Sequence, residues 1–129
     1  MQWQITNDAP VYAQLIAHIR QAIASGAFQP GERLPSVRDL ALAAGVNPIT
    51  MQRALQELER EGLVFSQRTA GRFVTEEPMR IEEAKRALAG AHIERFVQSM
   101  TQLGYGPEEI ITLLQGSMKG ETRHGDSGM

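Results

Sequence analysis

Hydrophobic residues recur at helical spacing in three segments of the first half of the chain. Over residues 10–25 they fall three or four positions apart, as in an amphipathic helix that buries one face. The same period recurs over 36–44 and 48–61, and a glycine directly follows each of the three segments as a helix stop. The residues that we expect in a three-helix core are Leu15, Ile16, Ile19, Ile23, Val37, Leu40, Ala41, Met51, Ala54, Leu55 and Leu58.

Polar residues that cap helices stand at the starts of the second and third segments. Ser36 is followed three residues later by Asp39, which resembles a capping box. Asn47 precedes Pro48, and proline is favoured at the first position of a helix. Both helix starts are therefore predicted from local residues alone.

Short β-prone runs replace the helical period after the third segment. Residues 63–67 and 72–75 predict two strands, joined by residues 68–71 as a hairpin. Helix, turn, helix and hairpin in this order predict a winged helix-turn-helix, whose main use is to place one helix in a DNA major groove. DNA binding is therefore the leading hypothesis, and we assign this domain to residues 1–76.

A second helical region follows the hairpin, so the predicted fold is mainly α with a small β-wing. Apolar residues at helical spacing predict a long helix over 79–103 and a short helix from Pro107, which form an arm over residues 77–115. Glycines and charged residues over 116–129 predict a disordered tail.

The arm carries a long apolar stripe that needs a partner surface. The stripe could fold back on the winged domain, but the pairing of DNA half-sites favours a two-fold homodimer. The residues that we expect in the dimer interface are Ile81, Leu88, Phe96, Met100, Leu103, Ile110 and Leu114.

Composition limits the other function classes. The net charge is −2, with +1 over residues 1–75 and −3 over the rest, so DNA binding must depend on where the arginines lie. The absence of cysteine excludes disulfides and thiolate metal sites and suits a reducing cytoplasm. The chain shows neither a secretory signal nor an apolar run that could span a membrane, so we expect a cytoplasmic protein without a membrane partner.

The sequence lacks the common nucleotide-binding, metalloprotease and serine-hydrolase motifs, so we expect neither an enzyme nor a cofactor. His92 lies near the apolar stripe of the arm, but His18 and His124 offer no evident second ligand. We therefore assign no metal site. The arm is too small for an enclosed effector pocket within one subunit, although a cleft between two subunits could hold a small molecule.

Side chains that could contact DNA lie on three of the predicted elements. The first turns of the third helix carry Asn47, Thr50, Gln52 and Arg53. Asparagine suits adenine, arginine suits guanine, and the threonine methyl group suits the methyl group of thymine. The further candidates, at the second helix and at the hairpin, are Arg33, Ser36, Arg38, Arg68, Gly71 and Arg72.

Each of these candidate DNA contacts also has a structural explanation that does not involve DNA. Any single arginine could be a solvated charge that pairs with a nearby acid, which is the commonest state of surface arginines. Ser36 and Asn47 both suit helix caps, with or without DNA. The set favours DNA binding because its polar groups fall on one side of a well-patterned core.

Residues 10–75 carry five closely spaced motifs: P-V-Y at 10–12, G-E-R-L-P-S-V-R-D-L-A at 31–41, G-V-N-P-I-T at 45–50, R-A-L-Q-E-L-E-R-E-G-L at 53–63 and G-R-F-V at 71–74. With these motifs the segment resembles the GntR family of bacterial transcription regulators. The resemblance implies that Arg38 and residues 47–53 contact a double-stranded DNA operator and that the wing enters a minor groove at Gly71. Gln52 stands where some relatives have arginine, so the operator sequence does not carry over.

The rest of the chain is too short for the large effector-binding domains of that family. F-V-Q-S-M-T-Q-L-G-Y-G-P-E-E-I-I-T-L-L at 96–114 resembles the short YtrA-type members, whose extension is similar to a helical dimerisation arm. This resemblance implies a homodimeric repressor on a palindromic operator, with a transporter operon as the target. The alternative is a winged helix that serves as a protein-interaction module without operator specificity.

Overall fold

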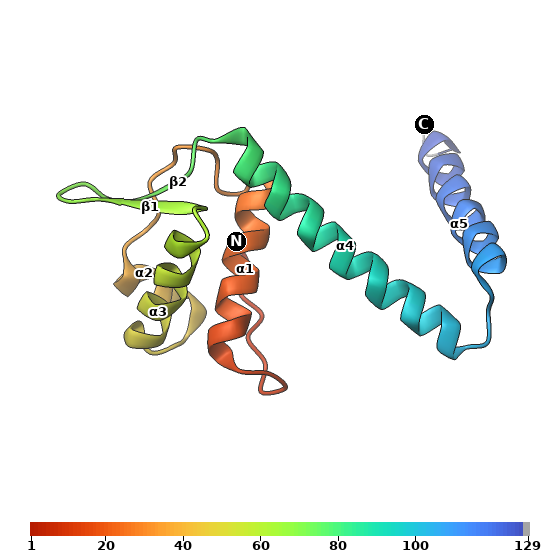
Figure 1. Ribbon diagram of the computed structural model, residues 1–129, viewed down its shortest axis with the longest axis horizontal. Coiled ribbons are helices and arrows are strands. Elements are labelled where there is room, and N and C mark those ends of the chain that lie inside the picture. The colour runs from red at the N-terminus through yellow and green to blue at the C-terminus, as the bar shows by residue number, and fades with distance from the viewer. Residues whose placement is uncertain (128–129) are drawn as a thin grey trace. The chain divides into compact units, whose positions relative to one another are not determined.

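The computed structural model describes residues 1–127, with side-chain surroundings for residues 1–120. The chain is mainly helical with a two-stranded antiparallel sheet, as the sequence predicts (Figure 1). Its elements are α1 (Val11–Ser25), α2 (Val37–Ala44), α3 (Pro48–Arg60), β1 (Val64–Gln67), β2 (Gly71–Val74), α4 (Pro78–Gln102) and α5 (Pro107–Ser127). They form two compact units, the winged-helix unit Met1–Leu88 and the C-terminal unit Ala89–Met129.

Local signals set the ends of the helices in the winged-helix unit. Ser36 Oγ accepts a hydrogen bond from Asp39 N at 3.1 Å, and Asn47 Oδ1 accepts one from Ile49 N at 2.8 Å. Pro48 occupies the first position of α3, where the backbone needs no donor. The glycines after α1 and α2 adopt the left-handed conformation that ends a helix. The predicted starts of α2 and α3 are confirmed.

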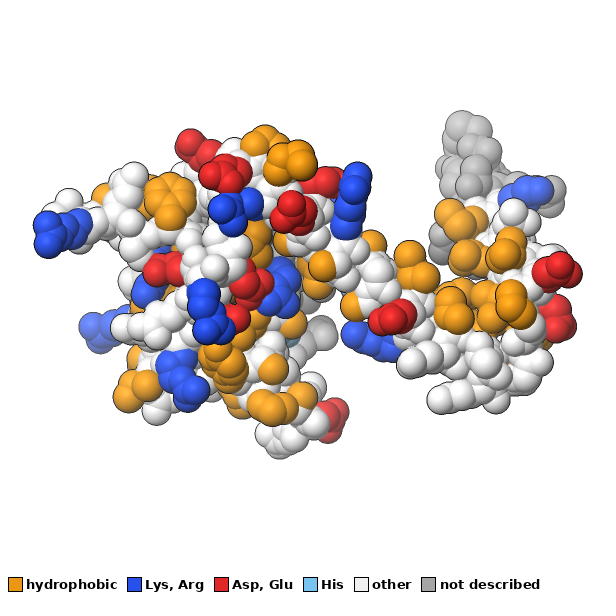
Figure 2. Space-filling model, in the orientation of Figure 1, with side chains coloured by type: hydrophobic (Ala, Val, Ile, Leu, Met, Phe, Trp, Pro, Cys, Tyr) orange, Lys and Arg blue, Asp and Glu red, His pale blue; other side chains and the backbone are white. Residues whose placement is uncertain are grey.

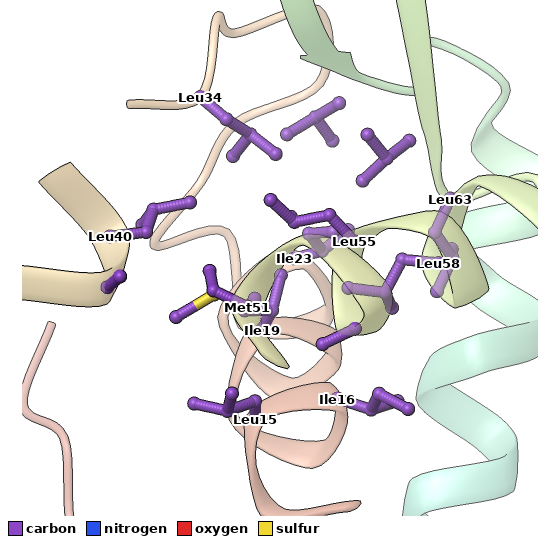
Figure 3. Close-up of a cluster of buried hydrophobic side chains, with 14 residues drawn as sticks. Leu15, Ile16, Ile19, Ile23, Leu34, Leu40, Met51, Leu55, Leu58 and Leu63 are labelled. Carbon is purple, nitrogen blue, oxygen red and sulfur yellow. The ribbon is translucent and has the colours of Figure 1, made fainter. Parts of the chain in front are cut away.

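The core lies where α1, α2 and α3 meet the base of the hairpin (Figure 3). Burying one leucine or isoleucine side chain contributes roughly 1.5–3 kcal/mol, so this cluster is the main source of stability in the unit. Its largest fully buried side chains are Leu15, Ile19, Ile23, Met51, Leu55, Leu58 and Val74. An ion pair between Arg20 and Glu61, at 2.7 Å, adds a link between α1 and the end of α3.

The wing is the hairpin of β1 and β2, in which Val64 pairs with Val74 and Gln67 pairs with Gly71. The segment before α2 lies along the other edge of β2. Leu34 N donates to Arg72 O at 2.8 Å, and Val74 N donates to Glu32 O at 2.9 Å. Strand β2 is therefore held along both edges, by β1 on one side and by residues 31–34 on the other.

The first turns of α4 belong to the winged-helix unit, because Ile81 and Ala84 pack against its core. Only residues 75–77 separate β2 from α4, so the start of this helix stays beside the wing. Ile81 is thus half-buried in the single chain, and its place in a dimer interface stays a prediction. The compact unit also extends twelve residues beyond the predicted boundary at residue 76, to Leu88.

The C-terminal unit contains the rest of α4, a turn at residues 103–106 and α5. Ile110 is buried, so it serves the inside of this unit and not an exposed interface, contrary to the prediction. Figure 2 shows hydrophobic side chains along both helices. The large apolar side chains left exposed here are Ile93, Phe96, Val97, Leu103, Tyr105, Ile111, Leu113, Leu114 and Met118.

Helix α5 is longer than predicted. It extends to Ser127, whereas the sequence predicts that it ends before Gly116. Gly116 and Gly120 have no positive φ and continue the helix. A glycine inside a helix costs about 1 kcal/mol relative to alanine, which does not by itself end the helix. The predicted disordered tail is therefore helical over 116–127, and residues 128–129 lie outside the described part of the chain.

Candidate nucleic-acid interface

Helix α3 buries one side and exposes the opposite side along its length. Met51, Ala54, Leu55 and Leu58 face the core, as predicted. Because successive residues turn by about 100°, the opposite side is centred between Ile49 and Arg53. The residues on this exposed side are Ile49, Gln52, Arg53, Gln56 and Arg60. We refer to these five residues as the outer face of α3.

The outer face is slightly hollowed. An open depression of about 330 Å³ is lined by Pro48, Ile49, Gln52, Arg53 and Gln56. Amide, guanidinium and apolar groups therefore lie together on the exposed side of this helix. Such a mixture matches the edges of base pairs in a major groove, which present donors, acceptors and methyl groups.

The structure changes the predicted membership of this face. Thr50 is half-buried at the border of this face, and so is Glu57. Ile49 and Gln56 lie on the outer face and were missed. Both could have been predicted from the buried residues of α3, because the exposed side of a helix lies half a turn away from the middle of its buried side.

Ser36 and Asn47, both predicted to contact DNA, serve as the helix caps described above. In each case one side-chain oxygen accepts a backbone hydrogen bond. Both side chains are nonetheless exposed, and the amide nitrogen of Asn47 can still donate to an acceptor outside the protein. Capping and DNA contact are compatible at Asn47.

Arg53 lies over the aromatic ring of Tyr12, with its Cζ atom 5.2 Å from the ring centroid. Tyr12 is in the first turn of α1, so a second helix orients this guanidinium. A cation–π contact at an exposed site contributes about 0.5–1 kcal/mol and leaves the guanidinium edge open for hydrogen bonds. The sequence did not reveal this contact, because it joins residues that are 41 positions apart.

The predicted arginines divide into two groups. Within the part of the chain that the structure describes, Arg33, Arg38, Arg53 and Arg68 form no ion pair with a carboxylate, whereas Arg72 does. Figure 2 shows basic side chains over the wing and over the α2–α3 part of the winged-helix unit. Unpaired guanidinium groups are suited to phosphate or to guanine.

Arg72 anchors the wing to α3. Its Nε donates to Glu59 Oε1 at 2.8 Å, and Ser66 Oγ donates to the same carboxylate oxygen. The side chains of Arg72 and Glu59 are 21% and 28% exposed. Burial raises the pKa of Glu59, but the hydrogen bonds from Ser66 and Arg72 and the charge of Arg72 outweigh it, so that the pKa lies below its usual value. Arg72 therefore has a structural role in the wing, and its contact with DNA stays a prediction.

The wing turns at residues 68–70, where Ala70 N donates to Gln67 O at 3.1 Å. Gly71 follows with a φ of 102°, a conformation that other residues rarely adopt. A Cβ atom at this position would lie 3.2 Å from Arg33 Nε. The backbone of the wing and the Arg33 guanidinium therefore lie against each other. The positive φ favours glycine here, and any other residue would also require the Arg33 side chain to shift slightly.

No helix in the described part of the chain is both long and apolar enough to cross a membrane. In the same part of the chain, no group of three or more histidine, cysteine, aspartate or glutamate side chains comes together in a way that could hold a metal ion.

A three-helix core, a β-hairpin and an exposed α3 bordered by unpaired arginines define a winged helix-turn-helix protein. The family model described as bacterial regulatory proteins, gntR family, matches residues 11–74. The chain is 36% identical over 111 residues to YhcF, an HTH-type transcriptional regulator of Bacillus subtilis, covering 86% of this chain and 92% of YhcF. The chain belongs to the GntR family.

A second relative defines the subfamily. The chain is 33% identical over 97 residues to the HTH-type transcriptional repressor YtrA of Bacillus subtilis, covering 75% of this chain and 70% of YtrA. With YhcF, this likeness supports the short YtrA-type subfamily, as the sequence predicts. The homologues of this chain are transcriptional regulators with DNA-binding domains.

Solved structures agree with this assignment. A GntR family transcriptional regulator from Listeria monocytogenes superposes with a TM-score of 0.80 at 35% identity, covering 87% of this chain and 98% of that chain. The DNA-binding domain of AraR in complex with operator ORX1 superposes with a TM-score of 0.50 at 29% identity, covering 58% of this chain and 92% of that chain. A domain of the same fold therefore binds an operator.

Proposed function

We propose that this chain is a sequence-specific transcriptional repressor that binds a palindromic operator as a homodimer. The observation that carries the proposal is the outer face of α3, which presents Gln52, Arg53 and Gln56 on the exposed side of the helix. In helix-turn-helix proteins the second helix of the motif enters the major groove with its first turns on the base edges. Helix α3 has that position in the motif.

The neighbouring elements supply groups for the DNA backbone. Arg38 is at the start of α2, Arg33 lies along the wing base, and Arg68 is at the wing tip. Because these three guanidinium groups form no ion pair within the described residues, phosphate contacts break no internal ion pair. We assign the minor groove to the wing, where the absence of a side chain at Gly71 lets the backbone approach closely.

The exposed apolar side chains of the C-terminal unit support a homodimer. Phe96, Leu103 and Leu114 are exposed in the single chain, and Met100 is half-buried. A two-fold dimer would cover them and would place two winged-helix units on half-sites about 34–36 Å apart. We therefore assign DNA binding to the winged-helix unit and dimerisation to the helices that follow it. The resemblance to YtrA-type regulators suggests a transporter operon as the target.

A gel-shift titration tests the proposal. The purified chain is titrated onto the DNA upstream of its own coding region, with excess unrelated competitor, at two salt concentrations. We expect a complex that survives the competitor and weakens with a slope of about −0.9 per phosphate contact in log affinity against log salt. Binding that the competitor abolishes would contradict sequence specificity. No binding even to bulk DNA at low salt would favour the protein-interaction module instead.

A further inference from the structure

Ile49 is a large apolar side chain in an unusual position. It is 71% exposed in the first turn of α3, while the other large apolar residues of this helix are buried. Single exposed apolar residues are common on proteins and by themselves indicate nothing. Ile49, however, lies in the depression that Gln52, Arg53 and Gln56 also line, so it forms the apolar part of a surface otherwise made of hydrogen-bonding groups.

The backbone of Ile49 is fixed by the helix cap, and its β-branched side chain has few rotamers. Its backbone N–H donates to the Asn47 cap at 2.8 Å, which fixes the first turn of the helix. A β-branched side chain within a helix occupies one χ1 rotamer about nine times in ten. Ile49 therefore presents its methyl groups in a defined direction and loses little conformational entropy when it makes a contact.

We propose that Ile49 reads the 5-methyl group of a thymine in the operator, an inference that rests on the proposed DNA-binding function. In the major groove, thymine alone among the four bases of DNA presents a methyl group, and an aliphatic side chain can contact it but cannot bond to a phosphate or to a polar base edge. Gln52 and Arg53 lie three and four residues further on, one turn along the same face. The thymine thus lies beside a base pair that Gln52 or Arg53 contacts.

The test begins with the intact chain and a randomised pool of DNA duplexes, from which bound sequences are selected. Each thymine of the selected site is then replaced in turn by deoxyuridine, which lacks only the 5-methyl group. For the unaltered protein we expect one position in each half-site where this change weakens binding about three- to fivefold, the equivalent of one buried methyl group.

Variants assign that position to a side chain. I49A should bind the thymine and deoxyuridine duplexes equally, whereas I49V should retain most of the discrimination. M79A is the matched control, because Met79 is also 71% exposed and lies in α4, away from the outer face. T50S removes the methyl group of Thr50, which is also a candidate for a thymine contact. Discrimination that is lost in T50S and kept in I49A would assign the thymine to Thr50 and overturn the role of Ile49.

The outcomes separate the inference from the function that it assumes. Discrimination that persists in I49A, or a selected site in which no thymine methyl group matters, would overturn the role of Ile49 while operator binding stands. If selection enriches no sequence at all, the proposed sequence-specific function fails, and this inference fails with it. Because Ile49 is exposed, circular dichroism should show that I49A is folded.

Discussion

Replacing Glu59 with glutamine isolates the contact that anchors the wing. The side chain keeps its size and can still accept a hydrogen bond from Ser66, but it loses the charge that pairs with Arg72 at 2.8 Å. The Arg72 guanidinium would then stay half-buried beside a neutral amide. Hydrogen bonds to charged groups contribute about 1.5–3 kcal/mol and exposed ion pairs about 0–1 kcal/mol. For this partly exposed pair we expect a loss of about 1–2 kcal/mol in the free energy of unfolding.

The pH dependence of this loss follows from the lowered pKa of Glu59. A carboxylate whose pKa is lower in the folded state stabilises the fold above its unfolded pKa, about 4.3 for glutamate. That contribution disappears as the pH falls through the folded pKa. The difference in unfolding free energy between the natural chain and E59Q should therefore be constant from about pH 7 to pH 5 and should narrow below that range.

Urea unfolding followed by circular dichroism measures both effects, with E57Q as the control. Glu57 pairs with Arg60 on the same helix, but the Arg60 side chain is 78% exposed, so E57Q should cost less than about 0.5 kcal/mol. The reasoning is refuted if E59Q costs no more than E57Q. It is also refuted if the cost of E59Q is the same at acidic and neutral pH.

Four further variants test the proposed DNA and dimer surfaces. R53A should lose about 1–3 kcal/mol of operator affinity as a base contact, and R38A should weaken binding to all sequences alike as a phosphate contact, with R86A as a control of equal charge on α4. Unchanged gel shifts with an intact fold would remove either residue from the site. Glutamate at both Phe96 and Met100 should give monomers in sedimentation velocity, and a persistent dimer would exclude them from the interface. G71A should weaken operator binding and lower the melting temperature, because it strains a φ of 102° and crowds Arg33; an unchanged melting temperature would contradict this.

The fold could be predicted from the sequence wherever the signal was local. The Ser36 and Asn47 caps, the glycine stops and the buried positions of α3 depend on neighbouring residues, and all were found. The predicted end of α5 was wrong because glycine and charged residues weaken a helix without ending it. The packing of Ile81 against the winged-helix core was not predicted, because helical spacing shows which residues share a face but not which surface that face contacts.

The candidate site was harder to predict, because its geometry depends on contacts between distant residues. Arg72 and Arg68 are alike in the sequence, four positions apart on one hairpin. Only the packing of the hairpin on α3 brings Glu59 to Arg72 and leaves Arg68 without an ion pair among the described residues. In the same way, only the packing of α1 brings Tyr12 under Arg53.

These contacts between distant residues distinguish two roles, binding DNA and positioning a residue that binds DNA. A measured loss of DNA affinity alone would not tell the two roles apart. Tyr12 and Glu59 position groups at the proposed DNA surface without being part of it, whereas Arg38 and Arg68 are available to phosphates. Removing a phosphate contact should reduce the slope of log affinity against log salt by about one unit, because one fewer counterion is released. Replacing Tyr12 with leucine should lower affinity with an unchanged slope, because the Arg53 charge remains and only its orientation is lost. The salt slope, measured for both kinds of variant, therefore distinguishes residues that bind DNA from residues that position them.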